Sequence, residues 1–177
     1  MKQVYPISIQ SGMSQSGSHI LMLLEPEGGR QIPIIIGAHE AQSILLAKET
    51  VRTRRPMTHE LMTKMMEAYG LTLTKVTIDR VLDGVFYSTL HVSDGFNTKQ
   101  LDSRTTDAVT LALLSDAPIL VDDNVLEETG VAADSQKNTS STPTLEALET
   151  ELRRCEEAED YERAAEIQQR IEEMRSK

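Results

Sequence analysis

The spacing of apolar residues along the chain alternates between the short period of β-strands and the longer period of helices. Short apolar runs predict strands at residues 4–9, 19–24 and 30–37. Apolar side chains then recur at helical spacing in residues 39–50 and 58–70, and Gly70 supplies a helix stop. The first part of the chain therefore predicts strands that lead into two helices.

The following residues predict a β-hairpin and then a second strand-to-helix transition. Apolar and polar residues alternate up to Thr74 and then shift phase by one residue, which predicts a β-bulge. The Asp83–Gly84 pair is a hairpin turn signal. Further strands are expected at residues 86–92, 98–101 and 118–121, and a helix is expected to start within residues 101–113. The expected fold class is α+β, a mixed β-sheet of about six strands with about three helices.

The composition of the chain changes after Val131. Residues 132–143 are small and polar, which predicts a flexible linker. Residues 144–177 have almost no strand signal and strong helical periodicity, which predicts a separate C-terminal α-helical hairpin. The predicted organisation is an α+β domain at 1–131, a linker at 132–143 and a hairpin at 144–177.

Bulk composition places the chain among globular proteins. Of its 177 residues 39% are hydrophobic and 26% charged, and no apolar run approaches the roughly 20 residues that cross a bilayer. The N-terminus has no long apolar segment of the signal-peptide type, and the single Cys155 suits a reducing cytoplasm, so we expect a cytoplasmic protein. A formal net charge of −10 counts against a large basic surface, so nucleic-acid binding would depend on local cations.

Acidic side chains recur near the starts of the predicted helices. These acids are Glu40, Glu60, Asp102 and Asp107. Thr58 is a candidate N-cap for one helix, and either Ser103 or Thr105 for another. Converging carboxylates could hold Mg²⁺ or Mn²⁺ and activate water, with Glu40, Asp102 and Asp107 as metal ligands. Acids at helix N-termini equally complement the helix dipole without any chemistry. His59 could act as a general base or as a structural hydrogen-bonding group.

The densest basic stretch of the chain lies just before His59. Arg52, Arg54 and Arg55 occur within four residues, and Arg104 stands beside the acids of the third helix start. Guanidinium groups bind phosphates through paired hydrogen bonds, so these four residues are candidate nucleic-acid ligands. The alternative is a solvated loop whose arginines pair with surplus acids.

Several separated blocks of the first module resemble the bifunctional nuclease domain family. The blocks are "RQIPIIIGAHEA", "RRPMTHEL", "LDGVFYSTLHV", "LDSRTTDAVTLAL" and "PILVDDNVLEETG", in the family's order and spacing. The resemblance covers residues 1 to about 131. It implies a self-associating α+β domain that cleaves RNA or DNA, with Glu40, His59, Glu60, Asp102 and Asp107 as candidate catalytic residues.

The C-terminal segment resembles a UVR motif, a short helical hairpin of excision-repair nuclease subunits. Leu145, Leu148, Leu152 and Cys155 form one apolar stripe, and residues 161–174 contain a second. The resemblance implies a protein partner for residues 144–177. The competing hypothesis for the whole chain is therefore a non-catalytic, self-associating adaptor that acts through this hairpin.

Overall fold

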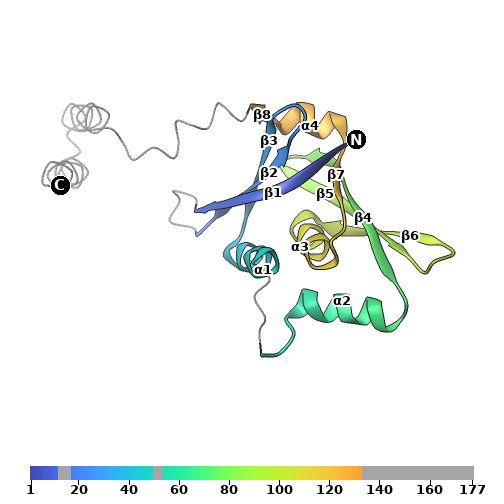
Figure 1. The fold of residues 1–177 in the computed structure, drawn as a ribbon. Helices are drawn as coiled ribbons and strands as arrows, with labels where there is room; N and C mark the ends of the chain where they lie inside the picture. Colours follow the sequence, from blue (N-terminus) through green and yellow to red (C-terminus); the bar gives the residue numbers. More distant parts are fainter. Residues whose placement is uncertain (12–16, 50–53, 133–177) are drawn as a thin grey trace, which may run out of the picture. The chain divides into compact units, whose positions relative to one another are not determined.

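The computed structural model describes residues 1–11, 17–49 and 54–132, which form a mixed β-sheet with helices packed against it (Figure 1). The elements in chain order are β1 (Lys2–Ser11), β2 (His19–Glu25), β3 (Arg30–Ile36), α1 (Ala38–Lys48), α2 (Thr58–Ala68), β4 (Thr72–Leu82), β5 (Val85–Ser93), β6 (Thr98–Arg104), α3 (Thr105–Ser115), β7 (Ile119–Val121), α4 (Asp123–Thr129) and β8 (Val131–Ala132). The expected α+β class is confirmed, with eight strands and four helices in the described residues.

The sheet consists of two antiparallel halves joined by a very short strand. The strand order is β6-β5-β4-β7-β1-β2-β3-β8. Strand β7 pairs antiparallel with β1 and parallel with β4, and the other neighbours in the sheet pair antiparallel. The three residues of β7 therefore connect the N-terminal meander to the β4–β5–β6 meander.

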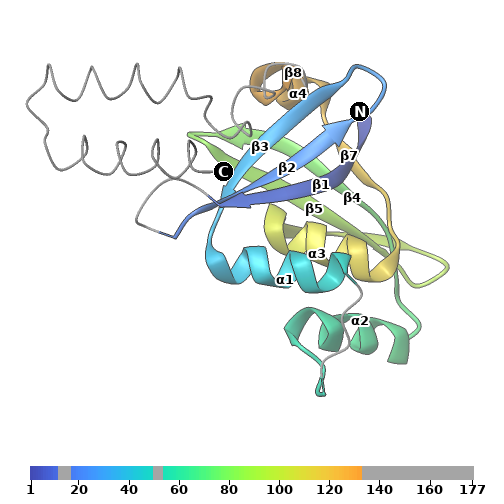
Figure 2. The ribbon, with the colours of Figure 1, turned by 60° about the vertical axis from the view of Figure 1, so that its left-hand side comes forward.

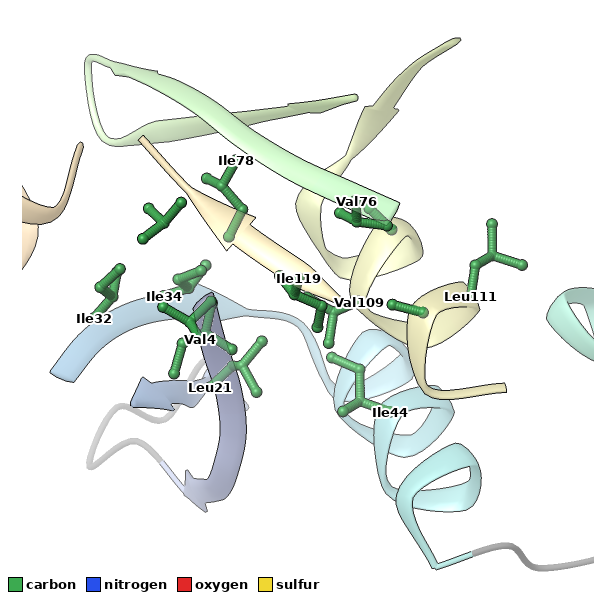
Figure 3. Close-up of a cluster of buried hydrophobic side chains, with 14 of the residues drawn as sticks. Val4, Leu21, Ile32, Ile34, Ile44, Val76, Ile78, Val109, Leu111 and Ile119 are labelled. Carbon is green, nitrogen blue, oxygen red and sulfur yellow. The ribbon is translucent and has the colours of Figure 1, made fainter. Parts of the chain in front are cut away.

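The apolar core lies where these two halves and helices α1 and α3 meet (Figure 3). Leu21 and Ile32 from the first half face Val76 and Ile78 from the second, while Ile44 of α1 closes the cluster from the helical side. All five are fully buried. Apolar residues at alternate strand positions share one face of the sheet, and this alternation produces the core.

Three local predictions made from the sequence are confirmed. The β4–β5 register shifts between Leu73 and Lys75, where the alternation predicted a bulge. Asp83 and Gly84 both have positive φ, 50° and 77°, as a two-residue type I′ hairpin turn requires. Gly70 has a φ of 67° directly after α2, as expected for a glycine that ends a helix.

The segment after β7 contains structure that the sequence pattern did not predict. Asp122 Oδ1 accepts a hydrogen bond from the Asn124 amide at 3.0 Å and so caps α4. Only Val125 and Leu126 of this seven-residue helix are buried, which is too few apolar positions to establish a helical period. Residues 133–143 of the expected linker and the hairpin expected at 144–177 lie outside the described residues.

Helices α1, α2 and α3 lie on one side of the sheet, and α2 is the outermost of them (Figures 1 and 2). Helix α3 contacts both α1 and α2, and α1 also contacts β2. None of the α2 residues is fully buried, whereas α3 contributes six buried residues. No helix in the described ranges has the length and apolar character needed to cross a bilayer.

Replacing Ile44 by alanine should destabilise the fold strongly. Ile44 is fully buried between α1 and the sheet, and removing such a side chain costs about 2–5 kcal/mol. Its neighbour Leu45 is 43% exposed, so Leu45→Ala should cost less than about 1 kcal/mol. Urea unfolding of both variants measures the difference, and equal losses would contradict this account of the core.

Candidate functional site

The beginnings of α1, α2 and α3 meet around one polar hollow of about 80 Å³. Each helix starts immediately after an extended residue, which directs its first-turn side chains toward the same space. The hollow is lined by His39, Glu40, Ser43, His59, Arg104, Thr106, Asp107 and Thr110. Four of the residues predicted from sequence, Glu40, His59, Arg104 and Asp107, are thus brought together.

Arg104 connects the carboxylates of two different helices. Its Nε donates to Asp107 Oδ2 at 2.8 Å and its Nη2 to Asp107 Oδ1 at 3.2 Å. Its Nη1 donates to Glu40 Oε1 at 3.1 Å. A guanidinium has five N–H donors, and these bonds use three, which leaves two (five minus three) on a side chain that is 68% exposed. The remaining donors can bind an anion that enters the hollow.

Asp107 holds His59 in a defined orientation. His59 Nε2 lies 3.0 Å from Asp107 Oδ1, and the two side chains are 16% and 28% exposed. Burial alone would raise the pKa of Asp107, but hydrogen bonds from Arg104 and His59 bring that pKa below its ordinary value. An ionised carboxylate only accepts hydrogen bonds, so Nε2 carries the proton and the neutral ring keeps its lone pair on Nδ1.

The same contacts act on Arg104 in the opposite direction. The hydrogen bonds and charge of Asp107, helped by Glu40, raise the pKa of Arg104. The guanidinium therefore stays charged while it joins the two acids.

The position of Glu40 depends on the absence of a side chain at Gly37. A Cβ placed on Gly37 would lie 2.5 Å from Glu40 Oε2, far inside van der Waals contact. Gly37 is the N-cap residue of α1, and its φ of −80° is open to any residue. A side chain at position 37 would therefore displace the end of the Glu40 side chain from this position, although the backbone conformation of Gly37 would accept it.

A buried hydrogen bond fixes the start of α3 against the sheet. Ser88 Oγ on β5 and Thr105 Oγ1, the first residue of α3, lie 2.7 Å apart, and both residues are buried. Thr105 neither caps the helix nor reaches the hollow. The N-cap residues are Arg104 for α3 and Met57 for α2, instead of the expected Ser103 and Thr58. The hydroxyl of Ser103 donates to the Arg104 carbonyl rather than accepting an amide of the first turn of α3.

Two of the candidate acids do not line the hollow. Asp102 lies opposite Thr89 of β5 in the sheet, so the two side chains are on the same face. The preceding residue, Ser88, contacts the start of α3, and side chains alternate along a strand. Asp102 therefore lies on the face of the sheet away from α3. Glu60 lines a second hollow, which shares His59 with the first, and its Oε2 accepts the Met57 amide at 2.8 Å. The bond from Glu60 completes the start of α2, which is the capping role considered from the sequence.

The candidate cations are distributed unevenly. Arg54 and Arg55 are exposed in the bend that leads into α2, a few residues before His59. Arg52 lies outside the described residues. The described part of the basic stretch is therefore adjacent in sequence to the hollow without lining it.

The side chains of the hollow do not match a metal centre. Among the described residues, no group of three or more His, Cys, Asp or Glu side chains is arranged to hold a metal ion. Two of the expected ligands, Glu40 and Asp107, bind the Arg104 guanidinium, and the third, Asp102, faces elsewhere. The Mg²⁺ or Mn²⁺ site expected from sequence does not fit this donor set.

Sequence reasoning missed four residues that line the hollow. His39 and Ser43 lie one helical turn apart on α1, as Thr106 and Thr110 do on α3. The Ser43 and Thr110 hydroxyls donate to the carbonyls of His39 and Thr106, at 3.0 Å and 2.7 Å. Their spacing from Glu40 and Asp107 along a helix is the signal that could have identified them.

Comparison with known proteins gives a consistent result. The model of the bifunctional nuclease domain matches residues 21–134. A protein of uncharacterised function from Mycobacterium tuberculosis, strains CDC 1551 and H37Rv, is 32% identical over 132 residues, 75% of this chain and 79% of the relative. Bifunctional nuclease 2 of Arabidopsis thaliana is 24% identical over 168 residues, 89% of this chain and 51% of that protein.

Removing the guanidinium should raise the pKa of Asp107. Burial raises the pKa of Asp107, and Arg104 is the main group that lowers it. In Arg104→Met this lowering effect is removed, so carbonyl NMR titration should find a higher pKa for Asp107 than in the unaltered protein. The lowered folded-state pKa of the unaltered Asp107 contributes stability above the unfolded pKa of about 3.9, which is lost as pH falls through the folded value. In Arg104→Met the folded pKa of Asp107 lies closer to or above its unfolded value, so Asp107 contributes less stability above about pH 3.9 and acidification removes less of it. Arg80→Met, which removes a guanidinium stacked on Tyr87, should leave the Asp107 titration unchanged.

Proposed function

The chain belongs to the bifunctional nuclease domain family, and from this premise we propose that the polar hollow cleaves phosphodiester bonds in RNA or DNA. One observation supports the proposal above the others. An imidazole oriented by a carboxylate and a guanidinium with spare donors occupy the same hollow. The first is suited to proton transfer and the second to binding a phosphate.

Arg104 is the proposed phosphate ligand. Its two remaining N–H donors would bind non-bridging oxygens of the scissile phosphate, while Asp107 and Glu40 keep the guanidinium plane fixed. A preorganised cation of this kind stabilises the charge that develops on the phosphorus oxygens in the transition state. In this mechanism Glu40 is a positioning residue and does not touch the substrate.

His59 is the proposed general base. The Nδ1 lone pair would take a proton from the attacking water, and Asp107 would stabilise the imidazolium that results. A new P–O bond forms to the water oxygen, and the P–O bond to the leaving sugar oxygen breaks. That oxygen leaves as an alcohol when it takes up a proton from solvent water, and His59 returns to its neutral form by releasing its proton to solvent. The other product is a phosphomonoester.

Arg54 and Arg55 supply local attraction for the nucleic-acid backbone, and Arg52 remains a sequence-based candidate for the same role. The protein carries a net charge of −10, so its long-range field repels polyanions. Cations in the bend before α2 would offset this repulsion near the hollow. Binding should therefore weaken steeply with salt, in proportion to the number of phosphates these few arginines contact.

Cleavage of labelled single-stranded RNA and DNA tests the proposed function. His59→Gln and Arg104→Met should each lower kcat/KM by roughly 100-fold or more, since each removes a group that acts in the transition state. Because the carboxylates of the hollow bind Arg104, activity should persist in EDTA as well as with Mg²⁺ or Mn²⁺.

His19→Gln provides the matched control for this assay. His19 is the first residue of β2, its Nδ1 donates to the Gly17 carbonyl, and it does not line the hollow, so the activity should not change. Cleavage that is undiminished in both His59→Gln and Arg104→Met would reject this site.

We also propose that residues 144–177 bind a protein partner, as the resemblance to a UVR motif implies. The apolar stripe of this segment carries the proposal, because a short helical hairpin buries such a stripe only against another surface. Leu148→Glu with Leu152→Glu should abolish capture of a UVR-bearing repair subunit by the full-length chain, whereas Glu149→Gln should not. Equal capture by all variants would contradict the docking role and leave the nuclease assay unaffected.

A further inference from the structure

Helix α2 presents a continuous apolar face to solvent. Leu61, Met62, Met65 and Tyr69 are 50%, 42%, 54% and 78% exposed. Their positions place them within about 100° of one another around the helix axis, so they form a single stripe. Met57, 47% exposed at the N-cap, extends the stripe toward the start of the helix. We refer to these five side chains as the α2 face.

The packing of α2 against the other described residues does not explain its stability. The helix has 11 residues and no buried one, and isolated helices shorter than about 12–15 residues are marginal in water. Its contacts are mainly with α3, and Met66, on the side opposite Leu61, packs against the core. The inward side of α2 is thus thinly buried, while the larger apolar side has no cover among the described residues.

We propose that the α2 face is covered by the α2 face of a second copy of this chain. A fully exposed large side chain presents about 200 Å², so the five exposed fractions amount to roughly 500 Å² of mostly apolar surface per copy. Two copies together supply roughly 1,000 Å². Because homodimer interfaces are about 65% apolar, the total buried area would be roughly 1,500 Å², within the range of specific interfaces.

A two-fold arrangement fits this face for a geometric reason. Residues 61 and 69 span about 12 Å along the helix axis, and two identical stripes of equal length match when the helices run antiparallel. The charged residue Lys64 lies beside the stripe, about 60° from Leu61 around the helix axis, and would form part of a polar rim that remains in contact with water.

Association through α2 would also stabilise the candidate site, although the proposal does not depend on nuclease activity. His59 lies in the first turn of α2, and Glu60 completes the start of this helix. Burial of the α2 face in a dimer would reduce fraying of the helix and keep His59 at its distance of 3.0 Å from Asp107.

Sedimentation velocity of the full-length chain across the micromolar range tests the proposal. The unaltered protein should sediment as a dimer at high concentration. Met65→Lys places a charge at the centre of the interface in both copies and should raise the dimer Kd by roughly 100-fold. Tyr69→Lys, at the most exposed position of the face, should also raise the dimer Kd. Agreement between the two variants would show that the change does not result from a folding defect specific to residue 65.

Ile35→Lys is the matched control. It places the same charge on an apolar side chain that is 79% exposed on β3, in the other half of the sheet. This variant should keep the dimer Kd of the unaltered protein, and circular dichroism should show all three variants folded. A monomer at every concentration, or a dimer whose Kd is the same in Met65→Lys and Tyr69→Lys, would overturn the proposal.

Discussion

The arrangement of the polar hollow depends on one guanidinium shared between two carboxylates. Arg104 bonds Asp107 at the start of α3 and Glu40 on α1, while His59 of α2 reaches the same Asp107 carboxylate. An exposed ion pair on its own contributes about 0–1 kcal/mol, so no single contact here has much effect. Together the contacts link the starts of α1, α2 and α3 through Arg104 and Asp107, and the position of each side chain limits the positions of the others.

The fold supports this cluster by controlling where α3 begins. Strand β6 ends at Arg104 and α3 starts at the next residue, with the buried Ser88–Thr105 hydrogen bond at the junction. The guanidinium is therefore set by the sheet, and Asp107 follows one helical turn later. Helix capping and ion pairing then involve different acids, because Glu60 satisfies a backbone amide while Asp107 and Glu40 bind the Arg104 guanidinium.

Local pattern predicted most of the elements, since the bulge near Lys75, the Asp83–Gly84 turn and the stop at Gly70 depend only on neighbouring residues. It did not predict α4, whose two buried apolar residues define no period. The meeting of three helix starts depends on packing between distant elements, so sequence could nominate Glu40 and Asp107 without showing that they share one partner. The orientation of Asp102 depends on its register with β5, which alternation along a single strand does not determine.

The central position of β7 has a consequence for how the protein is made. Its three residues lie near the end of the folded domain, yet they pair with the first strand of the chain and with β4. During synthesis the two antiparallel meanders remain separate sheets with open edges until residue 121 leaves the ribosome. The joining step closes a loop of more than 100 residues between β1 and β7 and is among the slower kinds of contact to form. A newly made chain therefore exposes its strand edges to other chains until its last few elements emerge.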